Sequence, residues 1–215
     1  MGSKRRPTEW SAAGAIDSHA HLERGTYGDE LPGVLQRAWA HGLSGIVLVS
    51  ASDNPAVFAE TAALAATDER LWMVAGIHPH CARHEPLLLP ALREILEDAK
   101  LVAIGEIGLD YHYDFSPRAA QQEVFRSQLS LAGERGLPVV LHLREALDDA
   151  LQILDEVAPV HHGIVHCFTG TVGEAEEFLK RGFHLSIPGI VTFGGGAHAL
   201  CDTVASIPLD RLLVE

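Results

Sequence analysis

Ala15-Ile-Asp-Ser-His-Ala-His-Leu22 is a short apolar segment with two histidines near its end. The chain repeats this pattern three more times, each time with a single glutamate or histidine at the end of the segment. The repeats are Val102-Ala-Ile-Gly-Glu106, Val139-Val-Leu-His142 and Ile164-Val-His166. One histidine after a strand carries little information. Five such groups, spread over four strand-like runs with helical patterns between them, indicate one polar cluster where the strand ends meet. The arrangement is typical of a metal-dependent hydrolase.

The rest of the chain follows the same alternation of strands and helices. Short β-branched runs predict eight strands, at 15–21, 45–50, 71–77, 101–106, 138–142, 163–167, 183–187 and 211–215. Amphipathic stretches predict helices near 31–41, 54–67, 87–99, 117–135, 145–157, 172–181 and 197–206. Start signals at Asn54-Pro55, Ser116-Pro117 and Thr171, and glycines at 42, 136 and 182, support these helix boundaries. The alternation implies parallel strands joined by right-handed crossovers.

Two architectures satisfy this pattern, an open doubly wound sheet and a closed (β/α)8 TIM barrel. We favour the α/β barrel because the candidate ligands come from strands one, four, five and six, and only closure brings all four strand ends around one point. A barrel carries its chemistry at the carboxyl ends of its strands, where each of these residues falls. We expect one barrel domain at 15–215, preceded by a disordered lead-in at 1–14.

Composition sets limits on the class of protein. With 215 residues and 47% hydrophobic content, the chain can bury one substantial core. The sequence has neither an apolar run of membrane-spanning length nor a signal-peptide pattern. Three widely spaced cysteines favour a reducing cytoplasmic setting over a disulfide framework. The net charge of −13 argues against a broad electrostatic grip on nucleic acid, but metal ions would reverse the local potential for a polyanionic substrate. Neither a membrane nor an obligate protein partner is implied.

The strand-end residues are candidates for metal binding. His19 and His21 lie two residues apart on a strand, so both point to the same side and can chelate one ion. Glu106 ends a buried strand, where a carboxylate needs a cation or hydrogen bonds, and its two oxygens could bridge two ions. His142 and His166 end the next two strands and offer a second nitrogen pair. For each of these residues, a structural polar contact is the alternative.

Other side chains are candidates for chemistry or substrate contact. His78, in Gly76-Ile-His-Pro-His80, faces the cluster by parity and could polarise substrate or act as an acid, whereas loop stabilisation is an equal alternative for both histidines. Arg144 could hold a phosphate in a planar fork, or pair with a neighbouring glutamate. Tyr111, after Asp110, could touch substrate, and Thr169 offers a hydroxyl. Cys167 should point away from His166, which indicates packing rather than a nucleophile.

The motifs together resemble a known family. They are His19-Ala-His21-Leu22, Gly76-Ile-His-Pro79, Gly105-Glu-Ile-Gly-Leu-Asp-Tyr111, Pro138-Val-Val-Leu-His-Leu-Arg-Glu145, His166-Cys-Phe-Thr-Gly170 and Ile187-Pro-Gly-Ile-Val-Thr-Phe193. In order and spacing this set resembles the TatD family of metal-dependent deoxyribonucleases. The resemblance implies a TIM barrel with two divalent ions, Mg, Mn or Zn. It implies that His19 and His21 hold one ion and that His142 and His166 hold the other. By the same resemblance Glu106 would bridge the ions. Together with His78, whose position predicts a part in the chemistry, Glu106 is the residue that we predict to be catalytic.

The sequence departs from the family pattern at three places. Gly194 replaces a lysine that is typical after the Val-Thr-Phe segment, which removes a possible phosphate contact and makes the loop more flexible. Leu143 stands where the family commonly has a small polar residue. The family's eighth strand continues past the residue that matches Glu215 to an aspartate ligand. We therefore expect the sequence to be a fragment that ends near the middle of strand eight.

The function that we predict is hydrolysis of DNA phosphodiester bonds by a metal-activated water. The same ligand set also suits a small amide, lactone or ester substrate, which is the main alternative. A third hypothesis is an inactive metal-binding barrel. The fold does not choose among the three, because barrels host many chemistries.

Overall fold

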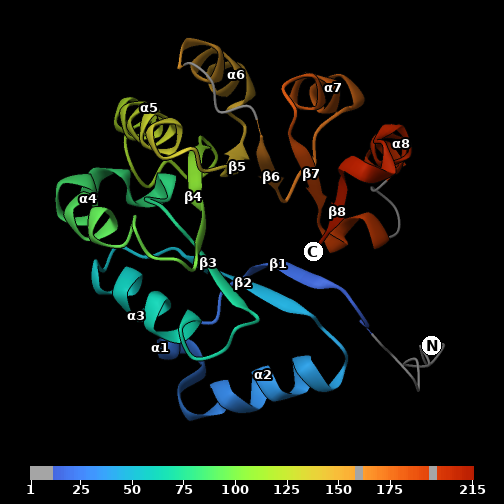
Figure 1. Ribbon diagram of the computed structural model, residues 1–215. Coiled ribbons are helices and arrows are strands. Elements are labelled where there is room, and N and C mark those ends of the chain that lie inside the picture. Colours follow the sequence, from blue (N-terminus) through green and yellow to red (C-terminus); the bar gives the residue numbers. More distant parts are fainter. Residues whose placement is uncertain (1–11, 158–161, 194–197) are drawn as a thin grey trace.

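A computed structural model describes residues 12–157, 162–193 and 198–215. Its strands form one parallel sheet of eight, paired in chain order from β1 to β8. The strands are β1 (Ile16–Ala20), β2 (Gly45–Ser50), β3 (Leu71–Ala75), β4 (Leu101–Asp110), β5 (Val139–Arg144), β6 (Gly163–His166), β7 (His184–Ile187) and β8 (Leu212–Val214). The sheet curls so that β1 and β8 approach each other (Figure 1). This arrangement confirms the predicted α/β fold of the TIM-barrel type.

The helices lie around the outside of the curled sheet (Figure 1). They are α1 (Arg24–Tyr27), α2 (Leu31–Ala40), α3 (Ala56–Ala65), α4 (Glu85–Glu94), α5 (Arg118–Arg135), α6 (Leu147–Glu156), α7 (Val172–Lys180) and α8 (His198–Ser206). Short 3-10 turns occupy Gly28–Glu30 (η1), Pro79–His84 (η2), Gly189–Thr192 (η3) and Leu209–Arg211 (η4). The seven predicted helices are all present, whereas α1 and the 3-10 turns were not predicted. No helix in the described part of the chain is long and apolar enough to cross a membrane.

Some of the helix signals act as expected. Thr171 and Glu174 form a reciprocal capping box at the start of α7, and Gly136 ends α5 in the left-handed conformation with φ of 63°. The Ser116 signal was wrong, because Pro117 occupies the N-cap of α5 without a side-chain bond. The Ser116 hydroxyl instead donates to the His80 carbonyl and accepts from the Arg83 amide, which fixes η2 against the start of α5.

The core has two parts. The larger lies between the sheet and the helices and contains the fully buried rings of Phe58, Phe125, Phe178 and Phe183. The smaller consists of side chains from β2 to β5, namely Val47, Val49, Val74, Ala103 and Val140. Because Val140 and His142 are two residues apart on β5, both project to the same face of the sheet. The small apolar cluster is therefore the floor of the barrel interior, below the polar groups at the strand ends.

Strand β4 is longer than predicted. It continues past Glu106 to Asp110, and its pairing with β5 runs to Asp110 opposite Arg144. Asp110 was expected in the following loop, so this boundary was wrong. The extension depends on Gly108, which has φ of 140° and lies so close to β5 that an added Cβ would be 2.2 Å from the His142 carbonyl oxygen. Only glycine allows the two backbones to approach in this way.

One side of the barrel stays open. Within the described residues, backbone pairing links each strand to the next from β1 through β8, and no pairing joins β8 to β1. Residues 12–14 of the predicted lead-in contact the end of α2, through hydrogen bonds from the Ala12 and Gly14 amides to the His41 and Gly42 carbonyls. Residues 1–11 and Gly194 lie outside the described residues, so the structure does not bear on the predictions made for them.

Candidate metal centre

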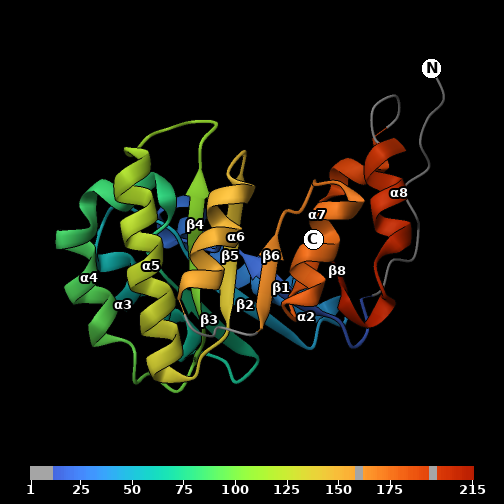
Figure 2. The same cartoon turned by 90° about the horizontal axis from the view of Figure 1, so that it is seen from above.

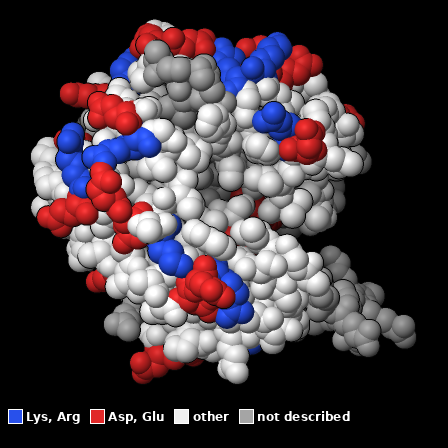
Figure 3. All heavy atoms as spheres, viewed as in Figure 1, with Lys and Arg blue, Asp and Glu red and all other residues white. Residues whose placement is uncertain are grey.

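A polar cluster occupies the carboxyl ends of the strands, as the sequence predicts. It lies in a cavity of about 380 Å³ whose lining includes His21, His78, Glu106, His142 and His166. Its members come from β1, from the segment after β3, and from β4, β5 and β6. In the space-filling view, the middle of the ring of strands is hollowed, with acidic atoms inside the hollow (Figure 3). The fold thus brings together all five of the predicted metal ligands and His78.

Glu106 is the centre of this cluster. Its side chain is 3% exposed and five imidazoles surround it. Oε2 faces the Nε2 atoms of His19 and His21, at 3.6 and 3.9 Å. Oε1 faces His142 Nδ1 at 2.9 Å and His166 Nε2 at 3.7 Å. The two oxygens therefore address two different histidine pairs, which are the pairs that the resemblance assigned to two ions.

The pKa of Glu106 lies well below its ordinary value. Burial alone would raise this pKa, but the hydrogen bonds and charges that His142, His19 and His78 direct at the carboxylate outweigh it. The side chain is therefore an anion at neutral pH. A buried anion surrounded by imidazole nitrogens is well suited to a divalent cation, which prefers such donors and would neutralise the charge.

His19 and His21 point to the same side of β1, as their spacing predicts. Their Nε2 atoms are 3.3 Å apart, and together with a Glu106 oxygen they form a group of three potential ligand atoms within 4.8 Å of one another. The His19 ring also stacks on the His166 ring, with centroids 3.6 Å apart and planes inclined by 10°. This stacking connects the two histidine pairs across the gap between β1 and β6.

His142 is held between two carboxylates. Nδ1 faces Glu106, and Nε2 lies 3.1 Å from Oδ2 of Asp110. Burial would lower the pKa of His142, but the two carboxylates outweigh it and raise the pKa above its ordinary value. A carboxylate on the far nitrogen of a metal-binding imidazole fixes the orientation of the ring and makes it a better ligand. Asp110 thus has the geometry to support His142.

Asp110 is itself fully buried and held by several donors. It accepts from His80 Nε2 at 2.8 Å and from the backbone amides of His112 and Tyr113. Burial would raise its pKa, but these hydrogen bonds outweigh it and lower the pKa to about 2. His80, for which sequence left function and loop stabilisation equally open, therefore contacts the cluster through Asp110.

His78 faces the cluster, with Nε2 3.9 Å from Glu106 Oε1. Burial lowers its pKa to about 3, so the ring is neutral at physiological pH. Its Nδ1 accepts the His80 amide, so in the neutral ring the proton is on Nε2, the nitrogen that faces the site. Of the two predicted roles, this state favours a hydrogen-bond donor that polarises substrate over a general acid.

Cys167 does not point away from His166, so that prediction was wrong. Strand β6 ends at His166, and Cys167 adopts a left-handed φ of 50°, which breaks the alternation of a strand. Potential ligand atoms of His166, Cys167 and Glu215 all lie within 4.8 Å of one another. Burial and the nearby Glu215 raise the pKa of Cys167 to about 11. The thiol stays protonated at neutral pH, which agrees with the expectation that it is not a nucleophile.

Glu215 is a residue of the site that the sequence reasoning did not connect to His166. Its Oε2 accepts from His166 Nδ1 at 2.7 Å and from the Ser186 hydroxyl at 2.8 Å. These contacts orient the His166 ring so that Nε2 faces Glu106. The signal was present in the sequence, because Glu215 is also a polar residue at the end of an apolar strand.

The three predicted substrate-contacting residues line a second cavity, of about 660 Å³, beside the cluster. Thr169 and Arg144 lie on its wall together with Tyr111. The Tyr111 hydroxyl is already engaged, since it donates to Asp149 at 2.6 Å and accepts from Gln122 at 2.7 Å. Burial and Asp149 raise the pKa of Tyr111. Tyr111 therefore shapes the cavity with its ring rather than offering a free hydroxyl.

Arg144 is the cation of this cavity. The alternative of a salt bridge with the neighbouring glutamate was wrong, because Glu145 pairs with His112 at 2.8 Å. The Arg144 guanidinium instead lies 4.7 Å from the centre of the Tyr113 ring. Glu145, like Cys167, is a non-glycine residue with positive φ, at 53°. Such conformations are unfavourable and concentrate at functional sites.

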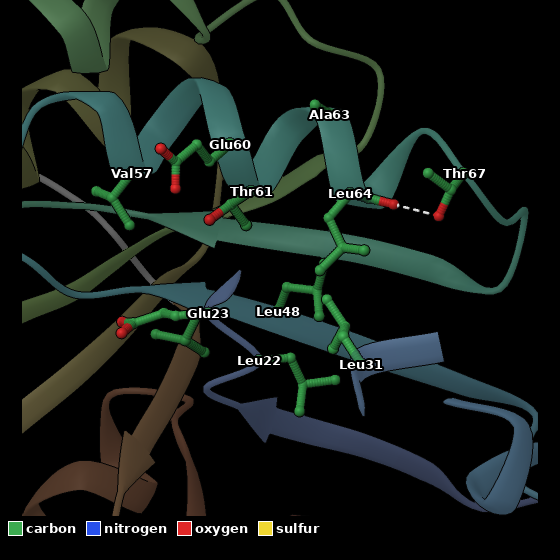
Figure 4. A pocket seen from close by; sticks show the side chains of 11 residues that line it. Leu22, Glu23, Leu31, Leu48, Val57, Glu60, Thr61, Ala63, Leu64 and Thr67 are labelled. Carbon is green, nitrogen blue, oxygen red and sulfur yellow. Dashed lines mark hydrogen bonds between the residues drawn. The ribbon is translucent and has the colours of Figure 1, made fainter. Parts of the chain in front are cut away.

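A third cavity, of about 250 Å³, has a different lining (Figure 4). Aliphatic side chains such as Leu22, Leu31, Leu48 and Leu64 dominate its lining, with Glu23 and Glu60 beside them. None of the predicted site residues lines this cavity. The predicted site residues that line a cavity are therefore found in the histidine cluster and the adjoining cavity.

Comparisons with known proteins agree with this geometry. The model of the family described as TatD related DNase matches residues 16–215. A Bacillus subtilis (strain 168) protein named uncharacterized metal-dependent hydrolase YabD is 41% identical over 204 residues, which cover 93% of this chain and 78% of that protein. The 3′-5′ ssDNA/RNA exonuclease TatD of Enterobacter lignolyticus is 38% identical, over 85% of this chain and 70% of the exonuclease. The crystal structure of YJJV, a TatD homolog from Escherichia coli K12, superposes with a TM-score of 0.85 at 32% identity, over 94% of this chain and 78% of that one.

Proposed function

Because this chain belongs to the family of TatD-related DNases, which makes it a metal-dependent hydrolase of ester bonds, we propose that it cleaves phosphodiester bonds of single-stranded DNA at the histidine cluster. The relatives named as exonucleases act on single-stranded DNA and RNA, so the same substrate class is the first to test. A cytoplasmic location stays a prediction from the cysteine usage.

The observation that carries the proposal is the double-sided environment of Glu106. One carboxylate oxygen faces His19 and His21, and the other faces His142 and His166. This geometry supports two divalent ions bridged by Glu106, because two-metal hydrolases use a shared ligand between ions about 3.5–4 Å apart. Nitrogen and carboxylate donors suit Zn²⁺ or Mn²⁺, while Mg²⁺ favours oxygen-rich sites.

Bound divalent ions would lower the pKa of a coordinated water and stabilise charge on the phosphate oxygens. The side chains of the protein have separate roles around these ions. Asp110 holds His142 in one orientation, and Glu215 does the same for His166. Neutral His78 presents an N–H toward the site and can donate to a phosphate oxygen. Arg144, at the edge of the adjoining cavity, can hold a second phosphate in its planar fork.

The test is hydrolysis of end-labelled single-stranded DNA with Mg²⁺, Mn²⁺ or Zn²⁺, and with EDTA as the metal-free control. Glu106→Gln and His142→Ala should each reduce the rate by about a hundredfold or more, because each removes a ligand or its charge. The matched control is His184→Ala, which alters a histidine at the opposite end of the barrel, on the first residue of β7. This variant should cleave at the unaltered rate.

Two results would contradict the proposal. If Glu106→Gln and His142→Ala cleave DNA as fast as the unaltered protein, the site is elsewhere. If no metal supports cleavage of DNA while an amide or lactone is turned over, the substrate is a small molecule and the alternative stated above is correct.

A further inference from the structure

The loop between β4 and α5, residues 111–117, carries two exposed aromatic rings. Tyr113 and Phe115 are 49% and 54% exposed. Their rings are stacked, with planes inclined by 2° and centroids 5.3 Å apart. At this separation parallel rings are offset rather than eclipsed, and about half of the surface of each residue stays exposed to solvent. Large aromatic side chains in water at the mouth of a polar site call for a functional explanation.

The two rings adjoin the candidate metal centre. The His80 ring makes edge-on contacts with Phe115 and Tyr113, at centroid distances of 4.8 and 5.7 Å. The same His80 bonds to Asp110 and lies 5.9 Å from the His142 ring. In the view from above, the loop between β4 and α5 rises beyond the ends of the neighbouring strands (Figure 2). A molecule that lies on the rings would therefore be beside the cluster.

The loop is held in its conformation before any substrate binds. Asp110 accepts the amides of His112 and Tyr113, and Arg83 Nη1 donates to the Phe115 carbonyl. Arg118, directly after the end of the loop, donates to the carbonyl of Tyr111 at its start. A platform fixed in this way loses little conformational entropy on binding, which favours affinity.

One arginine borders the rings, in a chain that carries a net charge of −13. The Arg144 guanidinium lies 4.7 Å from the centre of the Tyr113 ring and also lines the adjoining cavity. Aromatic faces beside an arginine are the combination that binds single-stranded nucleic acid, in which bases stack and the cation attracts the neighbouring phosphate. An apolar protein segment would offer no anionic group to pair with this guanidinium.

We propose that Tyr113 and Phe115 form a stacking platform for a nucleobase of the single-stranded substrate, with Arg144 on an adjacent phosphate. This inference rests on the proposed function and adds to it a base-binding subsite. Stacking is tolerant of sequence because every base presents a π face. The platform would therefore position a strand at the metal centre without selecting a particular base.

The experiment measures binding apart from cleavage. The probes are two fluorescent oligonucleotides of equal length, one of thymidines and one abasic, both with phosphorothioate linkages that resist hydrolysis. Fluorescence anisotropy in Mn²⁺ gives the Kd of each for the unaltered protein, for Tyr113→Leu and for Phe115→Leu. Tyr113→Phe and Phe115→Tyr keep a ring at each position. Leu87→Ala, at an exposed position on α4, is the control for a surface change elsewhere.

The unaltered protein should bind the thymidine probe more tightly than the abasic probe. Each leucine variant should reduce this preference by about fivefold to a hundredfold, which is the range expected for the loss of one base–aromatic stack. The ring-keeping variants and Leu87→Ala should retain the preference. Circular dichroism melting of every variant checks that the fold is intact.

The proposal is overturned if the unaltered protein binds both probes equally, or if the preference survives both leucine variants. Cleavage of unmodified DNA by the same preparations tests the nuclease separately. A preference lost in the variants, in a protein that cleaves no DNA, would support the platform and contradict the proposed nuclease. If the protein cleaves DNA but binds both probes equally, the proposed nuclease activity is supported and the stacking platform is contradicted.

Discussion

At the scale of single residues, Asp110 connects the metal centre to the loop beside it. It is fully buried and accepts from His142, from His80 and from two backbone amides. We expect Asp110→Asn to weaken metal binding by about tenfold to a hundredfold, because His142 loses the charge that orients it. Titration of the metal-depleted protein with Zn²⁺ or Mn²⁺, followed by calorimetry, measures this change.

A structural role alone would give a different result. If Asp110→Asn lowered the melting temperature but left the metal Kd unchanged, Asp110 would hold the loop and not the ligand. Asp149→Asn is a matched control, since Asp149 is also a carboxylate hydrogen-bonded near the site, through Tyr111, but does not contact His142. Its metal Kd should equal that of the unaltered protein.

The residues of the site differ in how far the sequence alone could predict them. His19, His21, Glu106, His142 and His166 were predictable because strand alternation and strand-end position determine their direction. The direction of the Cys167 side chain was not predictable, because a cysteine at the end of a strand does not indicate a left-handed φ. Asp110 was placed in the wrong element, although its spacing of four from Glu106 would have put it on the same face of a longer strand. The contact of His80 with Asp110 depends on how a 3-10 turn folds, which hydrophobic periodicity does not encode.

At the scale of elements, the approach of β4 to β5 depends on one glycine. An added Cβ at Gly108 would lie 2.2 Å from the His142 carbonyl oxygen, in a backbone conformation with φ of 140°. We expect Gly108→Ala to lower the free energy of unfolding by more than about 3 kcal/mol and to displace His142 from the site. Urea denaturation measures the first effect and metal affinity the second.

Gly173→Ala is the matched control for this substitution. Gly173 lies in the first turn of α7, and a Cβ there meets no atom within 4 Å. Alanine in a helix is favoured over glycine, so this variant should gain up to about 1 kcal/mol. If the two variants were equally stable, the β4 and β5 backbones could relax around the added Cβ more easily than their close approach indicates.

The turn between α3 and β3 contains a charge pair with a pH-dependent effect. Asp68 Oδ1 accepts from the side chain and the backbone amide of Arg70, and these bonds lower the pKa of Asp68 to about 2. A carboxyl whose pKa is lowered on folding stabilises the protein above its unfolded pKa, near 4, and loses this effect as the pH falls toward its folded pKa. The difference in melting temperature between the unaltered protein and Asp68→Asn should be constant above about pH 5 and shrink from pH 4 to 3.

Partial exposure limits the size of this effect, because solvent screens the pair. Thermal melts of both proteins across that pH range make the comparison, and acid effects from other carboxyl groups cancel in the difference. A difference that grows as the pH falls would mean that Asp68 does not stabilise the folded state through Arg70.

The order of the elements was predictable, and their lengths and connections were less so. All eight strands and seven helices follow from periodicity. The length of β4 was missed because Ile107-Gly-Leu-Asp110 contains a glycine, which reads as the end of a strand. The sequence places a start signal at Ser116 because its hydroxyl could cap a helix, and only the packed structure shows that the hydroxyl bonds to η2 instead.

At the scale of the whole molecule, the proposed ligands lie on both sides of the barrel opening. His19 lies in β1 and His21 follows directly after it, whereas His166 ends β6. One strand, β7, lies between β6 and β8, whose outer edge is unpaired in the described residues. Ions held by these histidines together with Glu106 would thus link the two margins of the sheet. At a metal concentration of about a hundred times Kd, each bound ion stabilises the fold by about 2.7 kcal/mol, so loss of even one ion to EDTA should lower the melting temperature by roughly 5–10 °C.

Differential scanning calorimetry with and without Zn²⁺ or Mn²⁺ measures this shift. In His142→Ala the shift should be smaller, and in a protein that lacks both His19 and His142 it should vanish. If neither added metal nor EDTA changes the melting temperature of the unaltered protein, the cluster does not hold an ion in solution.

Asp114, Glu145 and Cys167 take left-handed backbone conformations, with φ of 50°, 53° and 50°. All three lie beyond the carboxyl ends of neighbouring strands, on the loops that follow β4, β5 and β6, and each stores about 1–3 kcal/mol that glycine would release. Glycine substitutions that raise heat resistance are therefore expected at the rim of the candidate metal centre. The same substitutions would loosen the loops beside the candidate metal centre, so heat resistance gained there is expected to lower turnover.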